Sequence, residues 1–190
     1  MSEPGQPTTN ILPIIPNRDT VVFPSMLFPL AVREERWIRA IDSVVSSHKT
    51  IAFFYPTTED GPVTRDTLST IGCSATVVRL LRVPDGSVQV LLQGLNRVRL
   101  LELLQAEPFL IGRVETATEV LEDSIEIEGL VVNLRAQFQR LVGLSPNRPE
   151  ELSVAIENIA EPGRVADFVA ANMDLPLNEK QALLAELDVN

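Results

Sequence analysis

The spacing of apolar residues changes partway along the chain. Up to residue 121 they form short runs rich in β-branched and aromatic residues, such as 75–83 and 109–116, bounded by Pro, Gly and Asp. Such runs are typical of buried β-strands. Beyond that point apolar residues recur every three or four positions, as on one face of a helix. The pattern predicts an α+β chain with a disordered tail at 1–10, a β-rich lobe at 11–121 and a helical lobe at 122–190.

The first lobe contains one predicted helix and one clear hairpin. Within residues 34–47, apolar side chains follow helical spacing. The turn 84–86 reads Pro-Asp-Gly, which presets a tight reversal and predicts a hairpin between strands 75–83 and 87–93. Further strands are predicted at 11–15, 50–55, 97–103 and 109–116, the first of them at an edge or strand start because Pro13 lacks an N–H.

The second lobe carries signals for four helices. Asp123 or Ser124 is expected to cap a helix that Gly143 ends. Pro149 and Pro162 are expected in the first turns of the next two helices, where a missing N–H costs nothing. Asn178 is expected to cap the fourth.

Charge and composition exclude several classes of partner. The net charge is −10 and no run of Lys or Arg overrides it, so nucleic acid and anionic membranes are disfavoured. No apolar run is long enough to span a bilayer, and residues 1–10 resemble neither a signal nor a transit peptide. The single Cys73 cannot form an intramolecular disulfide. These features predict a cytoplasmic protein.

The chain lacks the residue combinations of an enzyme. His48 is the only histidine, and neither a phosphate-binding GxxxxGK[ST] loop nor a GxSxG nucleophile motif occurs. The carboxylates of residues 119–128 surround a predicted helix start, where they complement the helix dipole. We therefore expect a binding module with no catalytic residue, no metal and no cofactor of its own.

Four segments resemble the N-terminal substrate-recognition domain of ATP-dependent Lon proteases. Residues 12–26, LPIIPNRDTVVFPSM, are similar to LPxxPLRDxVVFPxM, and residues 29–41, PLAVREERWIRAI, to PLxVGRxxSIxAI. Residues 83–97, VPDGSVQVLLQGLNR, are similar to LPDGxxxVLVxGxxR, and residues 180–189, KQALLAELDV, to KQxLLExxDV. The sequence departs from this pattern at Asn17, Arg33 and Trp37, where leucine, glycine and a small residue are usual.

The resemblance implies a PUA-like β-pseudobarrel followed by a helical bundle. It implies a parent enzyme, an ATP-dependent serine protease in which an AAA+ ATPase and a Ser-Lys protease follow this domain. Such a parent uses ATP and Mg, forms a homohexamer and degrades unfolded, damaged or degron-bearing proteins that this domain helps to bind. One alternative is a stand-alone Lon-domain protein that binds partners without a protease. Another is an RNA-binding PUA-like domain, which the acidic charge disfavours.

A receptor for unfolded chains needs exposed apolar surface with adaptable side chains. Two segments fit this description. In the first, prolines are expected to keep an apolar run out of a sheet centre, and its candidate binding residues are Phe23, Pro24, Met26, Leu27 and Phe28. The second flanks the hairpin turn and comprises Leu80, Leu81 and Val83. Two alternatives are that these residues are core and that the acidic segment 119–128 captures basic substrates.

Overall fold

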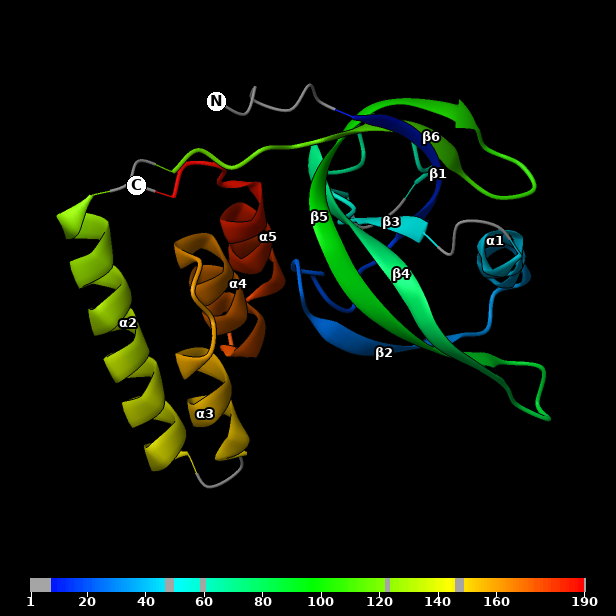
Figure 1. Cartoon of the computed structure of the whole chain (residues 1–190). Coiled ribbons are helices and arrows are strands. Elements are labelled where there is room, and N and C mark those ends of the chain that lie inside the picture. The colour runs from blue at the N-terminus through cyan, green and yellow to red at the C-terminus, as the bar shows by residue number, and fades with distance from the viewer. Residues whose placement is uncertain (1–7, 47–49, 59–60, 122–123, 146–148, 190) are drawn as a thin grey trace.

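The β-rich lobe is a sheet that closes on itself around one long strand. The computed structural model describes residues 8–46, 50–58, 61–121, 124–145 and 149–189. The lobe contains, in chain order, β1 Thr9–Pro16, β2 Leu27–Val32, α1 Glu35–Val45, β3 Thr50–Phe54, β4 Ile71–Arg82, β5 Val88–Gln105 and β6 Ile111–Thr116 (Figure 1).

Closure depends on the length of β5, which has 18 residues. The strand order is β2-β5-β4-β3-β1-β6, and β5 pairs additionally with β6. The first part of β5 pairs with β2, as Val88 does with Val32, and its later part pairs with β6, as Val98 does with Thr116. Strand β4 occupies the other edge of β5, and register shifts between these strands allow the bending that closure needs.

Alternating strand residues fill the barrel. Ile51, Leu92, Leu100 and Val114 are among its fully buried side chains, as expected when one face of each strand points inward. Helix α1 adds the apolar stripe that its spacing predicts, with Trp37, Ile41 and Val44 buried in the same cluster.

The second lobe consists of α2 Ile125–Leu144, α3 Glu151–Glu157, α4 Pro162–Asn172 and α5 Leu177–Ala185. Its own core is small: Phe138, Val142, Ile156 and Val165 are the buried members, and Phe138 meets Phe168 edge to face at 5.8 Å between ring centroids. Helix α2 lies at the outer side of the lobe, and α4 and α5 face the barrel (Figure 1).

The α+β architecture predicted from the sequence is confirmed, with local corrections. Strand β1 begins at Thr9, so the predicted tail is too long by two residues, and residues 1–7 lie outside the described residues. Strands predicted at 87–93 and 97–103 are one continuous strand, because Gly94 does not interrupt the pairing.

The helix signals were right at two positions and wrong at two. Ser124 caps α2, its side chain accepting from Ile127 N at 3.2 Å, and Pro162 occupies the first turn of α4. Pro149 precedes the cap of α3, so it is not in the first turn. Asn178 lies inside the first turn of α5, because the cap residue of this helix is Pro176 and the helix begins at Leu177. Asp123 lies outside the described residues.

In the described part of the chain, no helix has both the length and the apolar content needed to cross a bilayer.

Candidate functional site at the junction of the lobes

The two lobes share an apolar cluster. Its buried members come from the barrel lobe, the segment after β6 and the helices α4 and α5, and they are Val21, Phe23, Ile71, Ala117, Ala170 and Leu184. A hydrogen bond from Gln181 Nε2 to the Ile71 carbonyl, 2.9 Å long, adds a polar link between α5 and β4. The helical lobe is therefore docked on the barrel.

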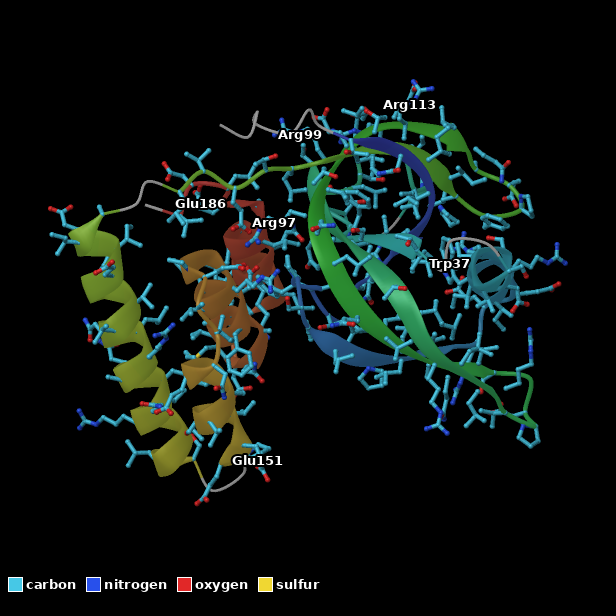
Figure 2. The ribbon with its side chains drawn as sticks, in the orientation of Figure 1. Trp37, Arg97, Arg99, Arg113, Glu151 and Glu186 are labelled. Atoms are coloured by element: carbon cyan, nitrogen blue, oxygen red, sulfur yellow. The ribbon has the colours of Figure 1, made fainter. Side chains whose placement is uncertain are left out.

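One arginine connects the barrel to three segments at this junction (Figure 2). Arg97 of β5, with 6% of its side chain exposed, donates through Nη1 and Nη2 to the Asp167 carboxylate at 2.8 and 2.5 Å. It also donates through Nη1 to Glu119 at 2.5 Å and through Nε to the Leu184 carbonyl at 3.0 Å. We name Arg97, Glu119 and Asp167 the junction cluster.

Burial governs the electrostatics of the junction cluster. It raises the pKa of Asp167 and of Glu119, with the Arg97 guanidinium working in the opposite direction on both. Burial by itself would lower the pKa of the Arg97 guanidinium. The hydrogen bonds and charge of Asp167 and the charge of Glu119 have the larger combined effect and raise it. The cluster is thus a desolvated ion pair that fixes geometry, with little net gain in stability.

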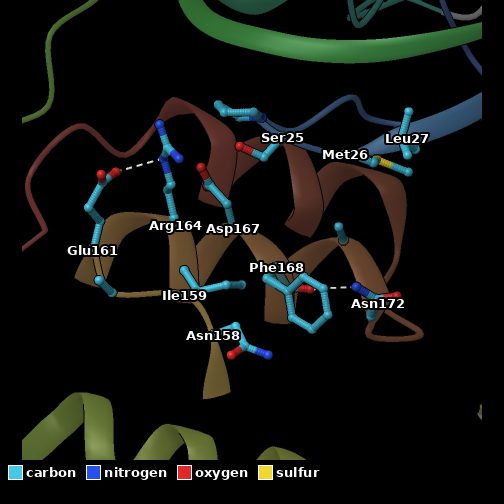
Figure 3. Close-up of a pocket in the computed structure, with 13 residues that line it drawn as sticks. Ser25, Met26, Leu27, Asn158, Ile159, Glu161, Arg164, Asp167, Phe168 and Asn172 are labelled. Atoms are coloured by element: carbon cyan, nitrogen blue, oxygen red, sulfur yellow. Dashed lines mark hydrogen bonds and ion pairs between the residues drawn. The ribbon is translucent and has the colours of Figure 1, made fainter. Parts of the chain in front are cut away.

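A groove of about 620 Å³ opens beside this junction, between residues 24–27 on the barrel side and the α3–α4 connection with helix α4 on the other side. We call it the interlobe groove. Met26 and Leu27 reach it from the barrel side, and Ile159 and Phe168 line the opposite wall (Figure 3). Its polar lining is Ser25, Asn158, Glu161, Arg164, Asp167 and Asn172.

The barrel wall of the groove is held by backbone contacts. Ser25 N donates to the Gly94 carbonyl at 3.0 Å, and Gly94 N donates to the Met26 carbonyl at 2.8 Å. A Cβ at position 94 would lie 2.1 Å from the Phe23 oxygen, so only glycine permits this approach. Ser25 adopts a φ of 63°, which turns the chain so that Met26 and Leu27 face the helices.

The polar groups around the groove are partly tied to one another. Arg164 Nε pairs with Glu161 at 2.6 Å, and Asn172 Nδ2 donates to the Phe168 carbonyl at 2.8 Å (Figure 3). The arrangement offers apolar contacts at the centre with hydrogen-bonding groups around them, which is the anatomy of a peptide or protein contact. Within the described residues, no three His, Cys, Asp or Glu side chains form a group that could hold a metal ion.

The family model for the ATP-dependent protease La (LON) substrate-binding domain matches residues 11–190. The chain belongs to this family. A Lon protease of Dictyoglomus thermophilum is 42% identical over 184 residues, covering 97% of this chain and 23% of the relative, and one of Roseiflexus castenholzii is 36% identical over 179 residues, covering 94% and 22%. The chain therefore spans less than a quarter of the length of these relatives.

Solved Lon domains share the fold. The N-terminal domain of a Mycobacterium avium complex Lon protease aligns with a TM-score of 0.77 over 95% of this chain and 92% of its own, at 19% identity. A Lon N-terminal domain protein from Xanthomonas campestris aligns with a TM-score of 0.68 over 95% and 93%, at 17% identity.

The first candidate segment of this Lon domain divides between core and surface. Phe23 and Phe28 are 1% and 3% exposed, and Phe28 packs edge to face against Phe53 at 5.4 Å. The expectation that these two rings offer exposed apolar surface is wrong. Phe23 is buried in the apolar cluster that the two lobes share, and Phe28 lies on β2, which pairs with β5, and packs into the barrel core. Pro24, Met26 and Leu27 line the interlobe groove, and binding by them stays a prediction.

The second candidate segment lies elsewhere on the Lon domain. Leu80 and Val83 are half-buried and Leu81 is 54% exposed, at the tip of the β4–β5 hairpin. The tip points away from the helical lobe (Figure 1), so the structure does not bring the two candidate segments together.

Sequence reasoning missed the far wall of the groove and the junction cluster. Ile159 and Phe168 follow the helical spacing of the second lobe and pack against its core, and each also lines the groove. Arg97 was noted only as a motif residue. The available signal was an arginine in an otherwise apolar strand pattern, which predicts a buried cation in need of a carboxylate partner.

Proposed function

We propose that this domain captures non-native protein segments in the interlobe groove. The observation that carries the proposal is that Met26 and Leu27 face Ile159 and Phe168 across an open groove. Leu27 is 58% exposed, so its side chain is accessible to a bound segment.

The physical basis is the apolar surface that unfolding exposes. Each large apolar side chain of a substrate that is fully buried contributes about 1.5–3 kcal/mol. Met26 is flexible and polarizable, so it can adapt to different side chains of the bound segment. The exposed side chains of Arg164 and Glu161 at the groove supply further donors and acceptors for an extended backbone, which favours bound segments without demanding one sequence.

We further infer the role of this domain in a longer protein from the relatives, which are Lon proteases. In such a parent the domain would deliver captured segments to an AAA+ pore driven by ATP and Mg, for hydrolysis by a Ser-Lys site. A cytoplasmic homohexamer is the assembly we expect. This part of the proposal rests on family membership, whereas capture in the groove rests on the geometry above.

Binding of fluorescently labelled casein, an unfolded protein, tests the capture step by anisotropy. The variant Met26→Ser/Leu27→Ser should bind about tenfold more weakly, a loss of about 1.4 kcal/mol. Ile11→Ser is the matched control, because Ile11 is 60% exposed on a strand outside the groove. It should bind like the unmodified chain.

Salt separates apolar capture from charge attraction. Exposed charges are screened over about 8 Å at physiological ionic strength, so attraction of a basic substrate to the acidic chain would fade as salt rises. Binding that depends on apolar burial should persist as salt rises. Equal binding by the groove variant and the unmodified chain, or complete loss of binding at about 0.5 M salt where the Debye length is only a few ångströms, would contradict capture in the groove.

A further inference from the structure

Helix α2 has two apolar faces. One packs against α3 and α4 and contains the buried residues Ile127, Phe138 and Val142. The other faces away from the lobe, on the outer side of the molecule (Figure 1). It carries Ile125 and Val132, which are 87% and 65% exposed. A surface helix ordinarily turns charged and polar side chains to this side, so the exposed apolar residues of α2 indicate a contact with another molecule.

The outward apolar stripe, which we call the outer face, has the spacing of a helix–helix contact. Its members are all exposed and are Ile125, Gly129, Val132, Ala136 and Gly143. They are separated by four, three, four and seven residues, as in helices that pack along their length. Glycine weakens a helix interior, yet a Cβ at position 129 would meet no described atom within 4 Å, so packing inside the chain does not require glycine there. Small residues allow two helix axes to approach closely.

The outer face is complementary in shape to a second copy of itself. Ile125 and Gly143, like Val132 and Ala136, are centred on residue 134 of the helix. In an antiparallel pair with a two-fold axis at this level, Ile125 of one copy would face Gly143 of the other, and Val132 would face Ala136. Each larger side chain would then fill the space that a small residue leaves on the opposite helix.

The charges beside the outer face favour the same register. Glu126 and Arg140 are exposed, and neither forms an ion pair with another described residue. They are fourteen residues apart, about four turns, so they lie on the same flank of the outer face. An antiparallel pair places this flank against the same flank of the other copy, so that Glu126 meets Arg140 twice by symmetry. A parallel pair would instead bring Glu126 level with its own copy and set like charges together.

We propose that two copies of this chain associate through the outer faces of α2, packed antiparallel. The proposal does not rest on capture in the interlobe groove, whose lining contains no residue of α2. Each copy contributes one helix, so the interface is small and the association should be weak and reversible.

Sedimentation equilibrium of the chain from about 10 μM to about 1 mM tests the proposal. The salt is kept at about 0.15 M, where repulsion between the acidic copies is screened beyond about 8 Å. The chain should pass from monomer to dimer and stop there, because a two-fold contact is closed. Val132→Glu should weaken the association at least about tenfold, since it places two carboxylates near the axis of the contact. Val154→Glu is the matched control, because Val154 is 62% exposed on α3, and it should associate like the unmodified chain.

Charge reversal tests the antiparallel register. Glu126→Arg and Arg140→Glu should each weaken the association about tenfold, although one lowers and the other raises the negative charge of the chain. The double variant Glu126→Arg/Arg140→Glu should recover the association, because it rebuilds both pairs in reverse. Equal association by Glu126→Arg and the double variant would overturn the antiparallel packing.

Three results would overturn the association itself. The first is a chain that stays monomeric at about 1 mM, and the second is equal association by Val132→Glu and Val154→Glu. The third is a monomeric chain in which unfolded casein shifts the amide resonances of residues 125–143, since the outer face would then be a surface for substrates.

Discussion

The barrel lobe and the helical lobe reach stability in different ways. The barrel closes through β5 and encloses an extensive buried core that α1 completes. The helical lobe has only four buried residues in its own cluster among those described, and it gains the rest of its burial from the junction with the barrel. The two walls of the interlobe groove come from different lobes. The contacts at the junction that dock the helical lobe on the barrel therefore determine the shape of the groove.

The largest expected effect comes from breaking the junction cluster. Arg97→Met should cost about 3–5 kcal/mol of unfolding free energy, because it leaves the Asp167 carboxylate buried without its cation. The double variant Arg97→Met/Asp167→Leu should recover most of this loss. Urea denaturation measures both. A single variant as stable as the unmodified chain would mean that the lobes do not depend on this ion pair.

The helical core provides the next test of the comparison. Phe138→Ala should cost about 3 kcal/mol, near the low end for a buried ring because the half-buried neighbours Leu134 and Phe168 can close in on the space. Exposed Leu130 on the same helix is the control, and Leu130→Ala should change stability by no more than about 0.5 kcal/mol.

Two probes show which lobe the Phe138 variant affects. The single Trp37 reports on the barrel by fluorescence, and far-ultraviolet circular dichroism reports mainly on the helices. In Phe138→Ala the helical signal should be lost at lower urea than the Trp37 signal. Coincident transitions would argue against a separate, weaker helical lobe.

A buried thiol gives the barrel core a pH-dependent signature. Burial raises the pKa of Cys73 from an ordinary 9.0 to about 12, opposed by a backbone hydrogen bond at Leu95. Between these values the unfolded chain has lost the proton that the folded chain retains, so stability falls as pH rises above 9. The loss attributable to Cys73 should be about 1.4 kcal/mol at pH 10.

Comparison with Cys73→Ala isolates the thiol from other groups that titrate in alkali. The stability difference between the two proteins should change between pH 7 and pH 10 in favour of the alanine variant. An unchanged difference would mean that the thiol is reached by solvent in the folded barrel.

The smallest expected effect concerns the start of α2. Ser124→Ala removes the side-chain acceptor for Ile127 N and should cost about 1 kcal/mol. Ser124→Asp should keep the cap and the stability. Thermal unfolding followed at the helical signal checks both, and an alanine variant that loses nothing would show that α2 frays at this end.

Local signals predicted the elements better than the contacts between them. The Pro-Asp-Gly turn, the stripe through Trp37 and Ile41 and the Ser124 cap are short-range features, and each led to the observed element. The continuity of β5 was not predictable in this way, because Gly94 resembles a strand break until the Phe23 carbonyl is seen against it.

The candidate site was predictable only on one side. The prolines around Met26 and Leu27 indicated an apolar segment outside a sheet centre; Leu27 begins the edge strand β2, and it lines the groove together with Met26. Which side chains of that segment turn inward depends on the pairing of β2 with β5, so Phe28 was misassigned. The opposite wall requires knowing how α4 docks, which Arg97 and Asp167 determine across 70 residues of sequence.

Methyl NMR of the domain with unlabelled casein tests the groove most directly. Spectra of the Met, Leu and Ile methyl groups are compared at low and high salt, with and without the unfolded protein. We expect shifts at Met26, Leu27 and Ile159 that persist at high salt, and none at Leu81, which is nearly as exposed as Leu27. Shifts at Leu80 and Leu81 instead, or shifts confined to methyl groups within residues 119–128 that vanish with salt, would contradict capture between the lobes.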